Sequence, residues 1–325
     1  RDQVKKLNEN GIRAASIHSN HSTDKEENEK INNQILEEAL LGNIKVLYIA
    51  PERQGNLEWQ EYLIKMNISM VVVDEAHCIS VWGHDFRPDY RKIVEIIKRI
   101  PKKIPVLAVT ATADNKIAID IFTQMKSSEV DKIEIVKRDL FRDNLSLNVI
   151  KVKNEEEKMV FLRNYLNKVK GNGIIYSATK AGVEKFQKWL EYNKITSAYY
   201  HSQIGIERVS IENKFMKNEY KCIVATNSLG MGIDKKDIRY IIHTEFPSSP
   251  IHYYQEIGRA GRDDKKSQII LLYCENDLKI QNHFIEQGRP KIEKYEKVIN
   301  AIKEEALTER QLIKNCNIKT AEFRV

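Results

Sequence analysis

Short apolar runs alternate with longer amphipathic segments along most of the chain. In the first half, three runs rich in β-branched residues predict strands buried on both faces: KVLYIA (45–50), ISMVVVD (68–74) and IPVLAVT (104–110). Between these runs, apolar residues that recur every three to four positions predict helices. Pro88 is expected to open one such helix, and Pro101 is expected to stop it.

The same alternation resumes after a connecting segment. The run LSLNVIKV (145–152) leads into a helix that Asn154 is expected to cap. Five more strands are predicted: GIIYS (173–177), SAYYH (197–201), KCIVAT (221–226), YIIHT (240–244) and QIILLY (268–273). Two rounds of alternation predict an α/β protein with two parallel-sheet lobes that meet near residues 138–150. After Pro290 the pattern becomes helical and charged.

Composition limits the class of protein. The 325 residues, with 42% hydrophobic side chains, are enough for about two domains of ~150 residues each. No apolar run approaches the ~18 residues of a membrane span, and no secretory signal is visible, so we expect a cytoplasmic chain. None of the four cysteines belongs to a C-x-x-C pair, which argues against a zinc site or disulfide framework. The net charge of +7 favours a polyanionic partner, although a solvated lysine-rich surface has the same charge.

Two adjacent acids, Asp74 and Glu75, stand at the carboxyl end of an almost wholly apolar strand. Ligand sites of parallel α/β sheets lie at that end. One carboxylate there could hold a hydrated Mg²⁺, while the other orients and deprotonates an attacking water. Thr110 and Thr112, which follow another predicted strand, could hydrogen-bond the acids. For an acid pair alone, the favoured interpretation is a cap of the next helix, so the remaining motifs must decide.

Glycines and arginines mark two motifs in the second half. Gly230 and Gly232 follow a predicted strand, where glycine allows the backbone to approach a phosphate or ribose. Arg259 and Arg262 stand three apart in YYQEIGRAGRD, on one helix face if the helix persists that far. Guanidinium groups so placed can reach a γ-phosphate and stabilise charge on the transferred phosphoryl group. A surface salt-bridge pair is the alternative interpretation.

The order of DEAH, TAT, GMGID and QEIGRAGRD is similar to that of the motifs in superfamily 2 helicases. The chain resembles RecQ DNA helicases over about residues 1–285, most specifically in DEAHCISVWGHDFRP, AVTATAD, GMGIDKKDIR and YYQEIGRAGRD. The resemblance implies two RecA-like lobes, 1–140 and 141–288, that bind ATP between them and single-stranded DNA across their top. A helical extension over 289–325 would be either the start of a winged-helix element or a plain pair of charged helices.

The resemblance also implies roles for individual residues. Asp74 would bind Mg²⁺ through water, Glu75 would be the catalytic base, and His77 would couple the ATP site to DNA. Arg262 is the expected arginine finger. The nucleotide-site residues expected from the second lobe are Gly230, Gly232, Asp234, Gln255, Arg259 and Arg262.

An aromatic loop directly follows the acids. A base that stacks on Trp82 or Phe86 would be sensed within a few residues of the ATP site. Such stacking contributes about 1–3 kcal/mol per base and tolerates any sequence, which suits a translocating motor. The alternative is that both rings belong to the core. His84 and Arg87 are also expected to touch DNA. The same is expected of four residues for which a structural role in loops is the alternative: Ser19, Asn20, His201 and Ser202.

The chain departs from the family pattern at both ends. None of its 13 glycines is followed by lysine, so the phosphate-cradling loop G-x-x-x-x-G-K-[ST] is absent. Residues 1–10 match a helix that lies beyond that loop, so we expect an amino-terminally truncated segment that is inactive by itself. The four-cysteine zinc module of the family has no counterpart here, and no zinc is expected within these residues.

These observations together predict the function of the whole protein. We expect an ATP-dependent, Mg²⁺-dependent DNA helicase that moves 3′ to 5′ on single-stranded, forked or partial-duplex DNA. We expect a monomer without membrane contacts, nucleoid-associated if bacterial, with a single-strand-binding protein as a candidate partner. Two other classes stay open, namely an RNA-directed ATPase and a non-catalytic nucleic-acid-binding remnant.

Overall fold

The chain forms two compact units, Arg1–Phe141 and Arg142–Val325. The computed structural model describes residues 2–18, 25–80, 87–100, 104–126, 134–137, 142–205, 207–229, 233–287, 292–304 and 307–316. Several predicted site residues lie outside these ranges: Ser19, Asn20, Trp82, His84, Phe86, Gly230 and Gly232. Among the helices of the described ranges, none is long and apolar enough to cross a membrane.

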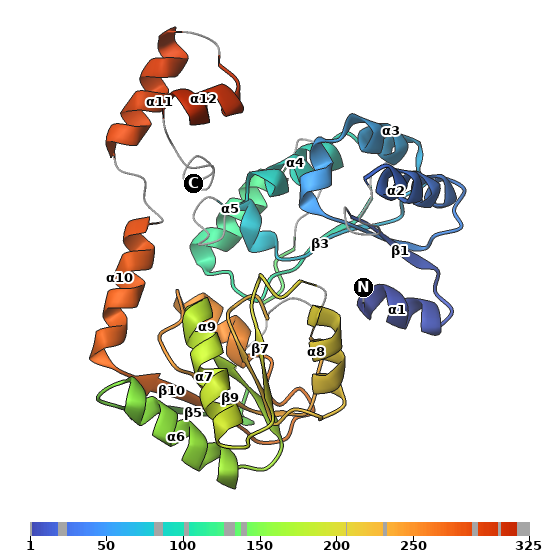
Figure 1. The fold of residues 1–325 in the computed structure, drawn as a ribbon. Coiled ribbons are helices and arrows are strands. Elements are labelled where there is room, and N and C mark those ends of the chain that lie inside the picture. Colours follow the sequence, from blue (N-terminus) through green and yellow to red (C-terminus); the bar gives the residue numbers. More distant parts are fainter. Residues whose placement is uncertain are drawn as a thin grey trace. The chain divides into compact units, whose positions relative to one another are not determined.

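The first unit alternates strands with helices (Figure 1). Its elements are α1 (Asp2–Glu9), β1 (Ala14–Ile17), α2 (Lys25–Leu40), β2 (Val46–Ile49), the 3₁₀ helix η1 (Pro51–Gly55), α3 (Leu57–Lys65), β3 (Val71–Val73), the 3₁₀ helix η2 (Ala76–Ile79), α4 (Pro88–Ile97), β4 (Val106–Ala108) and α5 (Asn115–Met125). β1 pairs with β2, and β3 pairs with β4, both in parallel. Each of the three apolar runs of the sequence therefore contains a strand, shorter than the run itself.

Local signals explain several helix boundaries of this unit. α4 begins at Pro88 as predicted, because proline at the first helical position has no N–H to leave unsatisfied. It ends at Ile97, before Pro101 is reached. The side chain of Asp114 caps α5 by accepting a hydrogen bond from the Ile117 N–H at 2.8 Å.

The β3–β4 pair of the first unit is buried on one face only. Val73 is 3% exposed and packs in a core with Val94 of α4 and Ile117 of α5. On the opposite face, Val72 is 55% exposed and Leu107 is 48% exposed. The prediction of burial on both faces is wrong for these strands, because no element within the described ranges covers that second face.

The second unit is built on one six-stranded sheet of order β5-β10-β9-β6-β8-β7, in which every pairing is parallel (Figure 1). Its elements are β5 (Leu145–Lys151), α6 (Glu155–Lys168), β6 (Asn172–Tyr176), α7 (Lys180–Tyr192), β7 (Ser197–Tyr200), α8 (Glu207–Met216), β8 (Cys222–Ala225), β9 (Ile238–His243), α9 (Pro250–Ile257), β10 (Ser267–Tyr273), the 3₁₀ helix η3 (Glu275–Asp277), α10 (Leu278–Gln287), α11 (Ile292–Glu304) and α12 (Glu309–Asn315). All six predicted strands form, and Asn154 caps α6 by accepting from the Glu157 N–H at 3.0 Å.

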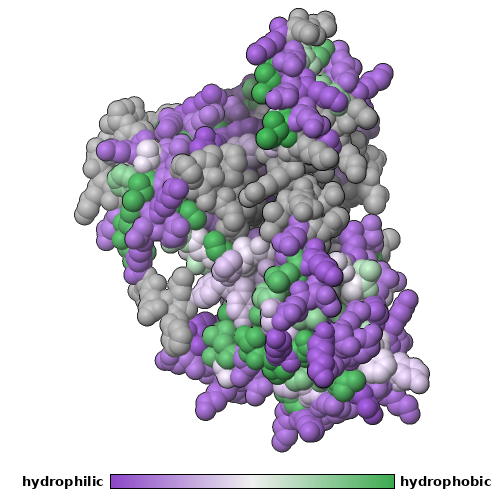
Figure 2. Space-filling model, turned by 90° about the vertical axis from the view of Figure 1, so that its left-hand side faces the viewer, coloured by the Kyte–Doolittle hydropathy of each residue, from purple (hydrophilic) through white to green (hydrophobic). Residues whose placement is uncertain are grey.

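Helices cover both faces of this sheet. One core contains Leu162 of α6 and Phe186 of α7, and the other contains Phe215 of α8 and Ile257 of α9. All four residues of β8 are buried, as expected for an inner strand of a parallel sheet. Hydrophilic side chains cover most of the described surface in Figure 2. The two parallel α/β units agree with the predicted fold class.

Candidate functional site

The acid pair of the first unit lies where β3 ends. The Val109 N–H donates to the Val73 carbonyl and the Ala76 N–H donates to the Val109 carbonyl, each at 2.9 Å, which holds the turn against β4. Glu75 adopts a left-handed backbone with φ of 50°, a conformation uncommon for residues other than glycine. Its N–H donates to Asp74 Oδ1 at 2.9 Å. Both acids are exposed, so their carboxylates are accessible to a ligand.

His77 connects the acids to the strand that follows them in the sheet. Its side chain is 2% exposed, and its Nδ1 lies 3.3 Å from Glu75 Oε2. The same Nδ1 lies 3.0 Å from Thr110 Oγ1, which also accepts the Thr112 N–H at 3.2 Å. Thr110 therefore reaches the acidic cluster through His77, and the two motifs form one hydrogen-bonded group.

The acid pair fits a hydrated Mg²⁺. The Tyr90 hydroxyl near the acids stays neutral at physiological pH. Burial, together with the nearby Cys78, Asp74 and Glu75, raises the pKa of Tyr90 to about 12. Within the described ranges, no group of three His, Cys, Asp or Glu side chains could hold a metal ion. Magnesium typically binds through one or two carboxylates while keeping several waters, and the exposed Asp74 can supply one such carboxylate, which leaves Glu75 to act on water.

The arginines of the second unit lie on a turn. α9 ends at Ile257, and Gly261 takes a φ of +57°, so the helix does not continue to Arg262. The condition for placing both arginines on one helix face is therefore not met. Arg262 Nη1 lies 3.1 Å from Asp234 Oδ1, with side chains 37% and 43% exposed. Arg259 instead lies near the Tyr176 hydroxyl, where its charge opposes the strong rise in the Tyr176 pKa that burial causes.

The two arginines therefore differ in their availability to a ligand. An exposed ion pair such as Arg262 with Asp234 contributes only about 0–1 kcal/mol, so an anionic ligand could replace Asp234 at little cost. Arg259 is partly buried, and its Nε has no hydrogen-bond partner among the described atoms. Gln255, one turn earlier on α9, is also partly buried.

Three of the residues predicted to touch DNA are described. His201 is 5% exposed, its Nε2 lies 3.2 Å from Glu184 Oε1, and its Nδ1 accepts the Gln203 N–H at 3.3 Å. Both ring nitrogens thus hold the loop after β7, while the neighbouring Ser202 is exposed. Arg87 is exposed just before α4. Direct DNA contacts of these residues stay predictions.

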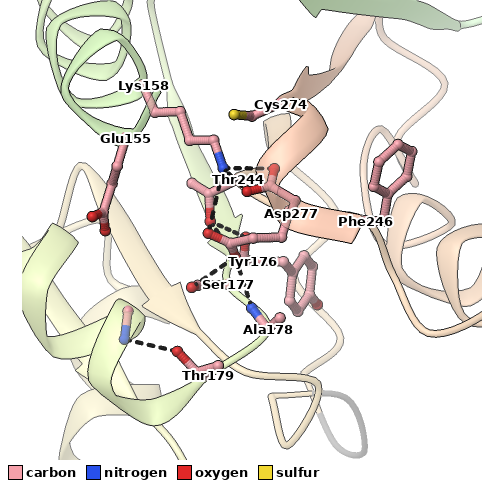
Figure 3. Close-up of polar contacts among 12 residues, drawn as sticks. Glu155, Lys158, Tyr176, Ser177, Ala178, Thr179, Thr244, Phe246, Cys274 and Asp277 are labelled. Atoms are coloured by element: carbon pink, nitrogen blue, oxygen red, sulfur yellow. Dashed lines mark hydrogen bonds and ion pairs between the residues drawn. The ribbon is translucent and has the colours of Figure 1, made fainter. Parts of the chain in front are cut away.

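A buried ionic network, missed at the sequence level, lies at the carboxyl ends of β6 and β9 (Figure 3). Lys158 is 2% exposed, and its Nζ lies 2.8 and 2.7 Å from the two carboxylate oxygens of Asp277 and 3.7 Å from Glu245 Oε1. Glu245 Oε2 accepts hydrogen bonds from Ser177 Oγ at 2.9 Å and from Thr244 Oγ1 at 2.8 Å. The available signal was that two predicted strands each end in polar residues.

A cavity of about 300 Å³ opens beside this network. Its lining residues are Tyr176, Ser177, Ala178, Asn227, His243, Glu245, Phe246, Pro247, Ser248, Glu256 and Gln281. His243 is 1% exposed, and its Nε2 lies 2.8 Å from Glu256 Oε2. Both carboxylates on the cavity wall already have partners within the protein, Glu245 in the network above and Glu256 in His243.

Comparisons with known proteins agree with these motifs. A family model described as DEAD/DEAH box helicase matches residues 1–119, and one described as helicase conserved C-terminal domain matches residues 157–264. The ATP-dependent DNA helicase RecQ of Bacillus subtilis is 37% identical over 290 residues, which are 89% of this chain and 47% of that protein. A putative ATP-dependent RNA helicase of Acanthamoeba polyphaga mimivirus is 38% identical over 253 residues, 75% of this chain and 44% of that protein.

Solved structures show the same fold. Mss116p bound to single-stranded RNA and AMP-PNP aligns with a TM-score of 0.64 over 98% of this chain and 69% of that chain. The sequence identity is 18%, so this likeness concerns the fold alone.

Two parallel α/β units that carry the DEAH and arginine motifs define a helicase with two RecA-like domains. Within that class, the chain belongs to the RecQ family, as the resemblance of its motifs indicated. The chain spans about half the length of the curated relatives it matches.

Proposed function

We propose that the whole protein hydrolyses ATP and uses it to move 3′ to 5′ along single-stranded DNA, unwinding duplex ahead of it. The observation that carries this proposal is a hydrogen-bonded group in which Asp74, Glu75 and His77 follow β3. Thr110, which follows β4, completes the group. It places two exposed carboxylates next to a buried histidine that reaches the following strand. Such a group can act on a nucleotide, and its histidine can transmit a change at Thr110 to the acids.

In the proposed mechanism, each residue does one part of phosphoryl transfer. Asp74 would hold the hydrated Mg²⁺, which supplies charge neutralisation for the phosphates when bound. Glu75 orients the attacking water and accepts its proton, and His77 holds Glu75 in place. Arg262 leaves Asp234 and stabilises the negative charge of the transferred phosphoryl group.

The proposed DNA path is sequence-independent. Trp82 and Phe86 would stack on bases directly after the acid pair, and Arg87 and Ser202 would meet the backbone. Single-stranded and forked DNA are the proposed substrates, with a single-strand-binding protein as the proposed partner. Because the 325 residues contain no glycine followed by lysine, we propose that they do not hydrolyse ATP by themselves. The tests therefore use the complete gene product.

The first prediction concerns the base. Glu75→Gln keeps the size of the side chain but removes its proton-accepting charge, so kcat for ATP should fall by about 10²–10⁴-fold while nucleotide affinity is kept. Phosphate release and binding of a fluorescent nucleotide measure the two quantities. Glu29→Gln, which removes the same charge from an exposed position on α2, is the matched control and should change neither. Retained turnover in Glu75→Gln would contradict the mechanism.

An RNA-directed ATPase is the second candidate function. It is favoured by the mimivirus relative, whose name is that of a putative RNA helicase. The discriminating measurement is ATPase stimulation by single-stranded DNA and by RNA of the same length and sequence. We expect stronger stimulation by DNA, and the double substitution Trp82→Ala with Phe86→Ala should remove stimulation while leaving the basal rate. Equal or stronger stimulation by RNA would favour the second candidate instead.

A further inference from the structure

We propose that Arg142 and Asn144 are positioning residues that fix the arginine turn, residues 258–265, for catalysis. The proposal rests on the proposed function and adds two residues that none of the helicase motifs above contains. Both lie immediately before β5, at the start of the second unit. Both side chains are partly buried.

Arg142 binds the first half of the arginine turn. Its Nη1 donates to the Gly258 carbonyl at 3.2 Å, and its Nη2 donates to the Gly261 carbonyl. Arg262 shares one of these acceptors, because its Nε donates to the Gly258 carbonyl at 3.4 Å. The position of the Gly258 carbonyl therefore sets both the Arg142 contact and the stem of the proposed arginine finger.

Asn144 binds the second half of the same turn. Its Nδ2 donates to the Gly261 carbonyl at 2.8 Å and to the Lys265 carbonyl at 3.0 Å. Its own carbonyl accepts the Ser267 N–H at 2.9 Å, where β10 begins. One asparagine thus joins the turn to the first residues of two paired strands, β5 and β10.

Gly261 shows how closely the turn packs against Asn144. A Cβ at position 261 would lie 2.5 Å from Asn144 Nδ2 and 2.8 Å from the Lys265 carbonyl oxygen. The Gly261 φ of +57° also disfavours any other residue. Backbone conformation and side-chain contacts therefore agree on one arrangement of the turn.

A turn outside regular structure needs such contacts to hold a catalytic arginine. The carbonyls of Gly258, Gly261 and Lys265 accept hydrogen bonds from the side chains of Arg142 and Asn144. Without these donors the turn could relax, and a misplacement of about 1 Å at a reacting group can cost about 10²-fold in rate. The effect belongs to kcat, because ATP can bind before Arg262 is in place.

The test compares Asn144→Asp and Arg142→Ala with the unchanged protein, using the complete gene product. Asn144→Asp keeps the shape of the side chain and removes both donated hydrogen bonds. We expect each variant to lower kcat of the DNA-stimulated ATPase by about 10–10²-fold. KM for ATP, affinity for single-stranded DNA and melting temperature should stay close to those of the unchanged protein. Arg142→Lys, which keeps a positively charged donor group, should recover part of the rate.

Asn148→Asp is the matched control. Asn148 is exposed on β5, and its amide donates only to Ser146 at the described positions, so the same substitution there should leave kcat unchanged.

Hydrogen–deuterium exchange separates this inference from the proposed function. Amides of residues 258–265 should exchange faster in Asn144→Asp and Arg142→Ala but not in Asn148→Asp. Unchanged exchange in that segment overturns the inference, as does a kcat that equals that of the unchanged protein. A protein whose ATPase is not stimulated by any nucleic acid would refute the proposed function, and the exchange result would then decide alone whether the two residues hold the turn.

Discussion

Lys158 carries its charge in the interior of the second unit, between Asp277 and Glu245. Replacement by methionine keeps the length of the side chain but leaves two buried carboxylates without their cation. Breaking a buried pair in this way costs about 3–5 kcal/mol, so Lys158→Met should lower the free energy of unfolding by that amount. Urea denaturation followed by circular dichroism measures it.

Lys185 supplies the control for that measurement. Its Nζ lies 2.5 Å from Glu155 Oε2, but the two side chains are 56% and 39% exposed. An exposed pair contributes about 0–1 kcal/mol, so Lys185→Met should change stability little. Similar losses in the two variants would show that burial does not decide the strength of the Lys158 network.

Single residues were predictable where their position in one strand defined their role. Asp74 and Glu75 follow an apolar run, and that alone places them at the carboxyl edge of a sheet. The left-handed backbone of Glu75 was not predictable, because the motif has no glycine to indicate it. Lys158 and Asp277 were not predictable as partners either, since they lie on α6 and η3 and meet only through the tertiary fold.

At the scale of the helix, the N-cap of α6 can be tested directly. Asn154 Oδ1 accepts the Glu157 N–H at 3.0 Å, and alanine would remove this acceptor. Asn154→Ala should lower the free energy of unfolding by about 1 kcal/mol, as loss of a cap usually does. Asn154→Ser keeps a capping oxygen and should lose only a small part of that stability in the same urea experiment. Equal losses would mean that the cap contributes through something other than its hydrogen bond.

Elements were predictable where their ends depend on neighbours in the sequence. Pro88 opens α4 and Asn154 caps α6 because both act within one turn of the chain. The end of α9 was not predictable, because the left-handed Gly261 fits between Asn144 and Ser267, residues from other parts of the fold. The exposed face of β3 and β4 was missed because an apolar run does not reveal which of its faces is covered.

For the whole chain, the alternation of strands and helices was sufficient to predict two parallel α/β units. Every strand of the second unit was anticipated because its β-branched residues are bounded by turns and caps. The order of those strands was not, since pairing depends on packing of helices on both faces rather than on any single run. The arginine turn likewise depends on the assembled unit, because Arg142 and Asn144, which hold it, lie before β5.

The pairing of β5 with β10 has a consequence for biosynthesis. β5 leaves the ribosome before the rest of the sheet, yet among the described strands it pairs only with β10, which is made last. At about 5–20 residues per second, the interval between the two is on the order of ten seconds. During that time the backbone groups of β5 lack their partner strand, and Leu145 and Ile150 lack the cores that they pack against in the folded unit, so chaperone binding to β5 would protect the yield of folded protein.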